Sequence, residues 1–450
     1  MDKRTFIKTS SILAGGAVVA HIAGCSSSAD QEHLSNWAGN LTYSTGNVHY
    51  PKTVAEVQEA IKKCKKLRAL GSKHSFNKIA DSTENLVSLK ELNKVVSLNK
   101  EAKTVTVEAG MRYGELAPYL HENGFALHNL ASLPHITVAG SVATATHGSG
   151  LNNGNLSTGV SAIEFVNAAG DLVSLSKQKD GEQFYGAVVA LGAIGVVTKL
   201  TLDLVPTFNM KQLVYRNLPM SELEKNFDSI ETGYSVSLFT DWKNKNINEV
   251  WIKMVADDSN ALPAPAELFG AKAATQNMHP IETESAENCT EQMGVPGPWY
   301  ERMPHFKMGF KPSAGKELQS EFFVPIEHAY PAIMAVEKLH EKVSPHLFIT
   351  EIRTIQADDF WMSPCYKKAC VAIHFTWKQE PEAVMALIPL IEEQLAPFNV
   401  KPHWAKLFTI APSVLQSRYE KLNDFKQLVN QYDPNGKFRN DFIRKNLFNS

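Results

Sequence analysis

Apolar residues recur with helical spacing in some stretches of the chain and alternate with polar residues in others. From Val54 onward they fall every three or four positions, and the hydroxyl of Thr53 suits an N-cap, so a helix is expected there. A second helix is expected over 113–122, because Asn123-Gly124 ends its pattern. A third, amphipathic helix is expected over 382–395.

Alternating or continuous apolar runs predict two groups of strands. The first group comprises 67–70, 104–108, a hairpin of 162–167 with 172–175, and 197–205. The second group comprises 321–324, 348–354 and 371–377. Helices and strands mix without strict β-α-β order, which favours an α+β fold.

The chain has 450 residues, above the size at which a single core usually stops growing, so two domains are expected. Pro206 closes the first block of strands. Residues 255–300 show little periodicity and are interpreted as a loop-rich insertion rather than a domain.

The N-terminus has the pattern of an export signal. A basic start, Lys3 to Lys8, precedes an apolar run too short to span a bilayer comfortably, and Ile22-Ala23-Gly24-Cys25 resembles a bacterial lipobox. We therefore expect 1–25 to be a signal peptide with lipidation at Cys25, and 26–40 to be a polar tether. The alternative is a plain signal peptide with an incidental cysteine.

The basic start also resembles a twin-arginine signal, with Lys3 in place of the first arginine, so both twin-arginine and Sec export stay open. The expected location is the bacterial cell envelope, on its periplasmic or outer side. Contact with the membrane is expected only through the lipid.

Charge and motifs exclude several classes of function. The formal net charge is −2 and the pI is about 6.7, so no nucleic-acid footprint is present. The chain lacks G-x-G-x-x-G, Walker A, H-E-x-x-H and G-x-S-x-G motifs, and its histidines and cysteines lack metal-ligand spacing. Pairing of the cysteines after Cys25 stays open, and Cys64 is expected to be a buried small hydrophobe.

Two polar segments carry the candidate chemistry. The predicted strand at 67–70 runs into the loop Gly71-Ser72-Lys73-His74-Ser75. Small residues let a backbone approach a phosphate closely, and an imidazole there can act as a nucleophile toward a bound cofactor. Residues 131–150 are rich in Ser, Thr and Gly and nearly free of charge, which suits a flat polar cofactor with a diphosphate.

Two further pairs of polar residues each share one face of a predicted strand. Glu351 and Arg353 are separated by one residue, as are His374 and Thr376. A carboxylate beside a guanidinium can hydrogen-bond adjacent hydroxyls of a polyol. The alternative is that Glu351 and Arg353 form a structural ion pair. Lys406, near His403, can stabilise a developing alkoxide, whereas an isolated lysine is usually a surface charge.

Taken together, these segments resemble FAD-linked oxidases of the vanillyl-alcohol-oxidase class. The residues that carry the resemblance also include 192–198, 351–353, 374–376 and 403–406. Within that class the chain is similar to the aldonolactone and alditol oxidase family. The resemblance covers most of the chain after about residue 40, and the segments occur in the right order. Ala405 departs from it, because the family usually has glycine there.

The resemblance implies an FAD-binding domain of the PCMH type over 41–205, a cap or substrate domain over 206–402, and a C-terminal segment, 403–450, that returns to the first domain. It implies FAD bound covalently through His74. The implied cofactor-binding residues are Gly71, Ser72, Lys73, His74, Ser75, Ser132, Thr137, Gly140, Thr144, Ala145, Thr146, His147, Val197 and His403.

For the substrate, the resemblance implies contacts from Ser132, Glu351, Arg353, Thr376 and Lys406, with Glu351, Arg353, Lys406 and His374 catalytic. The expected reaction oxidises a terminal hydroxyl of a polyol to an aldehyde, with O₂ reduced to hydrogen peroxide. The alternative substrate is an aldonolactone, with oxygen or another electron acceptor. A monomer without nucleic-acid partners or a metal is expected.

Overall fold

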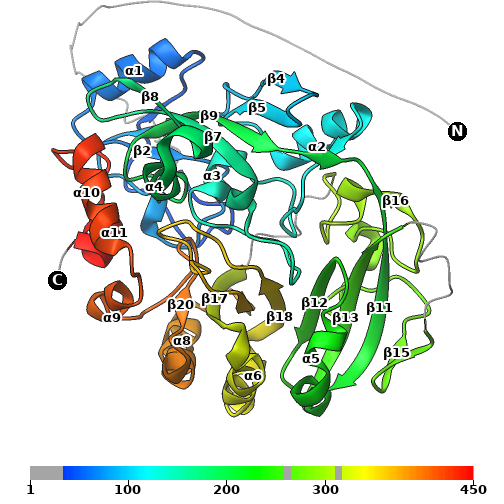
Figure 1. The fold of residues 1–450 in the computed structure, drawn as a ribbon. Helices are drawn as coiled ribbons and strands as arrows, with labels where there is room; N and C mark the ends of the chain where they lie inside the picture. The colour runs from blue at the N-terminus through cyan, green and yellow to red at the C-terminus, as the bar shows by residue number, and fades with distance from the viewer. Residues whose placement is uncertain (1–33, 257–264, 310–316, 449–450) are drawn as a thin grey trace, which may run out of the picture. The chain divides into compact units, whose positions relative to one another are not determined.

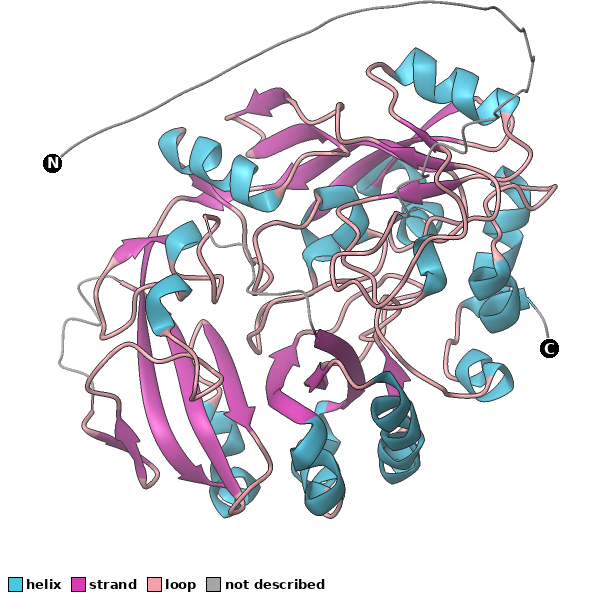
Figure 2. Ribbon diagram, turned by 180° about the vertical axis from the view of Figure 1, so that it is seen from behind, coloured by secondary structure: helices cyan, strands magenta, loops and turns pink. Residues whose placement is uncertain are grey.

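The computed structural model describes residues 34–256, 265–309 and 317–448. The predicted leader, the lipobox cysteine and most of the tether lie outside the described residues, so they stay predictions. Most of the described strands form two sheets, a five-stranded one and a ten-stranded one. The fold is of the α+β class, as predicted (Figures 1 and 2).

Strands β1 to β10 belong to the first half of the chain. A small parallel sheet has the order β1-β3-β2, the antiparallel five-stranded sheet has the order β4-β5-β9-β7-β8, and β6 pairs with β10. The strands are β1 Val48–His49, β2 Arg68–Leu70, β3 Leu86–Ser88, β4 Val95–Asn99, β5 Thr104–Glu108, β6 Phe125–Ala126, β7 Val160–Val166, β8 Leu172–Ser176, β9 Val196–Asp203 and β10 Val205–Pro206.

The ten-stranded sheet follows. Its order is β14-β15-β11-β13-β12-β18-β19-β17-β20, with β16 paired to β11. The strands are β11 Asn209–Pro219, β12 Ser235–Thr240, β13 Asn246–Val255, β14 Glu267–Leu268, β15 Ala271–Ala273, β16 Gly297–Pro298, β17 Glu317–Pro325, β18 Leu347–Ile355, β19 Cys370–Lys378 and β20 Lys401–Pro402. Helices α5, α6 and α8 lie along this sheet, at the bottom of Figure 1.

The α-helices are α1 Val54–Lys63, α2 Tyr113–Glu122, α3 Val138–Val142, α4 Lys177–Val188, α5 Leu223–Ile230, α6 Ala329–Glu337, α7 His340–Val343, α8 Pro381–Leu395, α9 Pro412–Ser417, α10 Leu422–Tyr432 and α11 Asp441–Ile443. Helix α1 begins as predicted, because the amide of Glu56 donates to the Thr53 hydroxyl at 3.2 Å. The other two predicted helices and all of the predicted strands are also confirmed, most with ends that differ by a few residues.

The C-terminal segment packs on the first half of the chain. The Leu67 amide donates to the Lys437 carbonyl at 3.1 Å, and the Ala168 amide donates to the Tyr432 carbonyl at 3.0 Å. Helices α10 and α11 lie beside α4 and β2 in Figure 1. Residues far apart in the sequence therefore close the same side of the core.

The predicted tether is too long at its C-terminal end. Residues from Leu34 onward fold against the histidine loop: the Trp37 amide donates to the Lys73 carbonyl at 2.8 Å, and the Asn36 amide group donates to the Ser75 carbonyl at 2.9 Å. Trp37 itself packs on His74, as described below. The polar residues 26–33 favoured a tether, and the prediction extended it over Trp37, which is part of the fold.

The four cysteines of the described region are buried free thiols: Cys64, Cys289, Cys365 and Cys370. Cys64 is therefore the buried residue that its helical position predicted.

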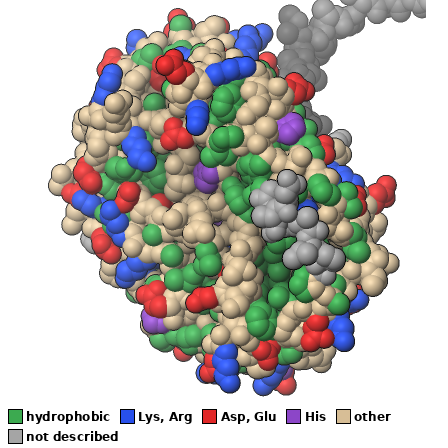
Figure 3. All heavy atoms as spheres, turned by 45° about the vertical axis from the view of Figure 1, so that its right-hand side comes forward, with side chains coloured by type: hydrophobic (Ala, Val, Ile, Leu, Met, Phe, Trp, Pro, Cys, Tyr) green, Lys and Arg blue, Asp and Glu red, His purple; other side chains and the backbone are tan. Residues whose placement is uncertain are grey.

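Within the described ranges, no helix is long and apolar enough to cross a membrane. On the face that Figure 3 displays, positive and negative side chains are interspersed rather than gathered into one patch.

Candidate active site

One large cavity, of about 1030 Å³, is lined by both halves of the chain. Its volume lies just above the range typical of small-molecule sites, about 300–1,000 Å³. One wall comes from the loop after β2, from α3 with its flanking loops, and from the segment before β9. The opposite wall comes from β17, β18, β19 and the loop after β20.

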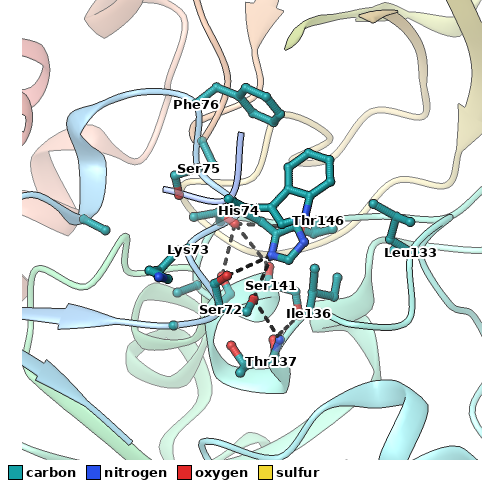
Figure 4. A pocket seen from close by; sticks show the side chains of 18 of the residues that line it. Ser72, Lys73, His74, Ser75, Phe76, Leu133, Ile136, Thr137, Ser141 and Thr146 are labelled. Atoms are coloured by element: carbon teal, nitrogen blue, oxygen red, sulfur yellow. Dashed lines mark hydrogen bonds between the residues drawn. The ribbon is translucent and has the colours of Figure 1, made fainter. Parts of the chain in front are cut away.

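The histidine loop forms a tight turn on the first wall (Figure 4). Lys73 takes φ +63°, and the imidazole of His74 turns back so that its Nδ1 lies 3.0 Å from the Ser72 carbonyl and 3.1 Å from the Ser72 hydroxyl. Trp37 stacks on this imidazole, with ring centroids 5.1 Å apart. Burial lowers the pKa of His74 to about 4, although the Ser72 hydrogen bond opposes this, so the ring is neutral at physiological pH.

Two features of this wall suit a close-fitting ligand. His74 Nε2 is buried and has no hydrogen-bond partner among the described residues, so it can serve a bound group. Gly71 and Gly140 face each other, and a Cβ on either would lie within 3.0 Å of the Thr137 hydroxyl oxygen. Backbone and hydroxyl groups thus line the space that side chains would otherwise fill.

Gly195 places the segment before β9 against the sheet. It takes φ +157°, and a Cβ there would meet the Val166 carbonyl oxygen at 2.3 Å, so only glycine fits. This close approach brings Ile194 and Val197 onto the cavity wall. Val197 was predicted as a cofactor-binding residue. The close packing at Gly195, which the sequence pattern did not reveal, explains why it lies on this wall.

The opposite wall carries a buried charge cluster centred on Glu321 of β17. Its Oε1 accepts a hydrogen bond from Arg353 at 2.8 Å and lies 3.1 Å from His147 Nε2, and its Oε2 accepts one from Lys406 at 2.7 Å. Burial alone would raise the pKa of Glu321, but Lys406, His147 and Arg353 hold it well below its ordinary value. Glu321 is therefore an anion that positions two cations, Arg353 and Lys406, together with the His147 imidazole.

Strand register explains this convergence. Glu321 pairs with His374, and His374 pairs with Glu351, so the three side chains form a row across β17, β19 and β18. Gln319 and Thr376 form the next row on the same face. The predicted sharing of a strand face by Glu351 with Arg353, and by His374 with Thr376, is visible here, since all four line the cavity.

Arg353 contacts three side chains of this cluster, so it is more than half of a simple ion pair. Its Nη2 donates to Glu321, its Nη1 donates to the Ser132 hydroxyl at 3.4 Å, and its Nε lies 3.5 Å from Glu351 Oε1. Lys406 reaches the same carboxylate of Glu321, and burial lowers its pKa although Glu321 opposes this. A guanidinium held on three sides has one fixed orientation.

Two atoms of the cluster remain available to a ligand. Glu351 Oε1 is engaged by His305 Nε2 at 2.7 Å, whereas Oε2 has no hydrogen bond from the described residues. His374 Nε2 is buried and equally without a partner there. Burial, strengthened by Lys406, holds the pKa of His374 well below its ordinary value, so its imidazole is neutral.

The cavity gathers nearly every residue that the sequence pointed to. Gly71 to Ser75, Ser132, Thr137, Gly140, Thr144, Thr146, His147, Val197, Glu351, Arg353, His374, Thr376, His403 and Lys406 all line it. Ala145 does not: it is 2% exposed, takes φ +54° and belongs to the hydrophobic core. Its backbone turns the chain so that Thr144 and Thr146 lie on the wall.

The sequence patterns did not indicate Trp37, Glu321, His305 or Lys253, whose Nζ lies 3.0 Å from His305 Nδ1. Glu317, Gln319 and Glu321 alternate with Leu318, Ser320 and Phe322, and all three polar residues line the cavity, so the alternation that paired Glu351 with Arg353 was a usable signal. His305 and Lys253 flank the loop-rich segment and carry no comparable pattern.

Comparisons with known proteins agree with this architecture. A family model described as "FAD binding domain" matches residues 46–176, and one described as "D-arabinono-1,4-lactone oxidase" matches 311–446. Among solved structures, a solvent-stable cholesterol oxidase superposes with a TM-score of 0.73 at 15% identity, covering 92% of this chain and 97% of that one. A carbohydrate oxidase from Microdochium nivale superposes with a TM-score of 0.71 at 16% identity, covering 92% and 95%. Together with the relatives described next, the fold and the FAD-binding model define a flavoprotein oxidoreductase of the vanillyl-alcohol-oxidase class, with FAD as its cofactor.

Sequence relatives narrow the class. An alditol oxidase from a Streptomyces species is 44% identical over 415 residues, which covers 91% of this chain and 98% of the relative. An L-gulono-1,4-lactone dehydrogenase from Mycobacterium tuberculosis is 26% identical, covering 92% and 98%. The chain belongs to the FAD-linked aldonolactone and alditol oxidase family.

Proposed function

We propose that this chain oxidises a terminal hydroxyl of a polyol to the aldehyde, with O₂ as the final acceptor. The balanced reaction converts R–CH₂OH and O₂ into R–CHO and H₂O₂. The observation that carries the proposal is the row of Glu351, His374 and Glu321 with Arg353 on the cavity wall. In this row His374 Nε2 has no partner among the described residues, and only Oε1 of Glu351 is engaged there, by His305. The alditol oxidase relative supports the same substrate class.

FAD, when bound, would supply the acceptor for the hydride that leaves the alcohol carbon. The chain must orient the alcohol and take up the hydroxyl proton. Glu351 stays ionised, because, against the effect of burial, Arg353 and His305 hold its pKa far below the ordinary value. Its Oε2 therefore accepts a hydrogen bond from a substrate hydroxyl and fixes its direction, while neutral His374 offers the second free atom to the reacting group.

Arg353, Ser132 and Lys406 recognise the neighbouring oxygens. Arg353 and Ser132 are already 3.4 Å apart, so one hydroxyl can contact both. Lys406 lies on the other side of Glu321 and stabilises negative charge that develops on the reacting oxygen. This set of donors and acceptors matches a chain of adjacent hydroxyls.

A substrate panel tests the proposal. Xylitol, sorbitol and glycerol are compared with gulono- and galactono-1,4-lactone by anaerobic bleaching of the flavin absorbance and by aerobic peroxide release. Turnover of polyols with stoichiometric peroxide is expected. Bleaching by lactones alone would favour the second candidate, an aldonolactone oxidase or dehydrogenase, which the lactone oxidase family match supports. Bleaching without peroxide would overturn the oxidase assignment.

We further propose that His74 attaches covalently to the flavin. Its buried, unpartnered Nε2 on the cavity wall and the fixed, neutral ring support this. Yellow colour should stay in the acid-precipitated pellet of the wild type and leave it in His74→Ala. Colour in the wild-type supernatant would contradict the proposal.

We also propose that the chain is exported and held at the membrane by lipid on Cys25, which the lipobox-like residues 22–25 support. Cells that express Cys25→Ser should release the enzyme from the membrane fraction, whereas the unmodified chain should stay with it. Equal distribution of the two forms would contradict lipidation at Cys25.

A further inference from the structure

We propose that His305 and Lys253 are positioning residues that orient the Glu351 carboxylate so that its Oε2 faces a substrate hydroxyl. The inference rests on the proposed function and adds two residues to it. Both lie outside the segments that carry the family resemblance: Lys253 is on β13, and His305 belongs to the loop before β17.

The three side chains form a continuous buried line. Lys253 Nζ lies 3.0 Å from His305 Nδ1 and also donates to the Met303 carbonyl. His305 Nε2 lies 2.7 Å from Glu351 Oε1. Lys253 is 1% exposed and His305 is 4% exposed, so water does not compete for these contacts.

The partners decide which nitrogen of His305 carries the proton. The Glu351 carboxylate is ionised, so its Oε1 can only accept, and Nε2 of His305 must carry the proton that it donates there. The neutral ring has one proton, so Nδ1 has the lone pair and accepts from Lys253 Nζ. The opposite tautomer would set the Nε2 lone pair against a carboxylate oxygen.

The same loop fixes other parts of the wall. The His305 amide donates to the Ser132 carbonyl at 3.1 Å, and the ring packs edge-on against Trp251 and Phe239 with centroids 5.2 and 5.6 Å away. Burial, strengthened by Lys253, lowers the pKa of His305 to about 4, so the ring is neutral at physiological pH. One rigid residue therefore orients the carboxylate of Glu351 and tethers the backbone of Ser132.

This arrangement assigns separate tasks to the two oxygens of Glu351. Oε1 is occupied by His305 and lies beside Arg353 Nε, so the carboxylate plane cannot rotate freely. Oε2 accepts no hydrogen bond from the described residues, and Glu351 lines the cavity. A misplaced reactant costs up to about 100-fold in rate even for a shift of about 1 Å, so loss of this orientation should be visible in kcat.

Kinetics of four single variants and one double variant test the proposal. His305→Leu removes the donor and should lower kcat/KM for the best polyol by about 10- to 100-fold, mostly in kcat, with flavin content unchanged. His305→Gln should recover most of this loss, because its amide can donate to Glu351 and accept from Lys253. Lys253→Met should lose activity, and adding it to His305→Leu should cost little more. His128→Leu removes a histidine that bonds Thr158 and does not line the cavity, and it controls for imidazole loss.

Three outcomes would overturn the proposal: unchanged kinetics in His305→Leu, no recovery in His305→Gln, or full additivity of the two losses. ¹⁵N NMR of histidine-labelled holoenzyme gives a readout independent of turnover. The His305 signal, assigned by its absence in His305→Gln, should show the Nε2–H tautomer in the wild type and change in Lys253→Met. An Nδ1–H tautomer or an imidazolium would also overturn it. If the wild type oxidises neither polyols nor lactones, the proposed function fails, and the NMR result still decides the orientation of His305.

Discussion

The two walls of the cavity offer a ligand different kinds of interaction. On the wall around His74, small residues, hydroxyls and backbone groups define a shape. Within the part of the chain that the structure describes, its buried Arg68 donates only to backbone carbonyls, among them those of Leu191 and Gly192 at 2.8 Å each. On the opposite wall, Arg353 lies among carboxylates, and every buried carboxylate has more than one cationic or histidine partner. The first wall suits a large cofactor bound by fit, and the second suits a small polar substrate bound by charge.

The largest expected effect is on the charged wall. Arg353→Met leaves Glu321 and Glu351 buried without their shared guanidinium, and breaking a buried pair by removing one partner costs about 3–5 kcal/mol. We expect a large drop in melting temperature together with loss of activity, measured by thermal unfolding and peroxide release.

A partly exposed pair gives the control. Arg216→Met removes the partner of Glu282, whose side chain is 68% exposed, and should cost less than about 1 kcal/mol. If the two variants unfold at the same temperature, the contrast in energetics between a cavity pair and a surface pair is wrong.

Glu351→Gln should separate chemistry from cofactor binding. It keeps the shape but removes the negative charge that orients the hydroxyl, so kcat/KM should fall by about 100- to 1,000-fold while flavin content stays the same. Glu249→Gln is the matched control, since Glu249 is equally buried, accepts from Trp251 at 2.7 Å and does not line the cavity. Loss of flavin in Glu351→Gln would show that the two walls are not independent.

Much of this contrast could be predicted from the sequence, because period-two spacing puts Glu351 with Arg353 and His374 with Thr376 on common faces. Two kinds of feature could not. Pairing between strands, which lines Glu321 up with His374, depends on register that local patterns do not encode. Trp37 and His305 come from segments without periodicity, whose positions are set by tertiary contacts with Lys73 and Ser132.

Acid should weaken the charged wall through its neutral histidines. The pKa of His305 is lowered to about 4, against about 6.5 in the unfolded chain, so the unfolded state binds more protons between those values. Stability is therefore full above about pH 6.5 and falls as the pH drops toward 4, with a share for His305 of about 2 kcal/mol at pH 5. His305→Gln should show a smaller fall in melting temperature between pH 7 and pH 5 than the wild type. An identical fall would contradict the neutral, buried state of this ring.

The smallest expected effect is on the wall around His74. A Cβ at Gly140 would lie 2.8 Å from the Thr137 hydroxyl oxygen, and one at Gly71 would lie 3.0 Å from it, so Gly140→Ala should disturb the wall slightly more than Gly71→Ala. Overpacking of this kind costs about 1–3 kcal/mol, and we expect it to appear as a several-fold lower flavin content, read from the ratio of flavin to protein absorbance. Melting temperature is a poorer readout, because alanine also favours the short helix α3 that contains Gly140.

The matched control is Gly46→Ala, where a Cβ meets no described atom within 4 Å. Substrate affinity of the flavin-loaded fraction should be unchanged in Gly140→Ala, since Glu351 and Arg353 are on the other wall. A variant that kept its flavin but lost polyol affinity would mean that the small-residue wall shapes the substrate pocket as well. Fit and charge would then act on one ligand rather than on two.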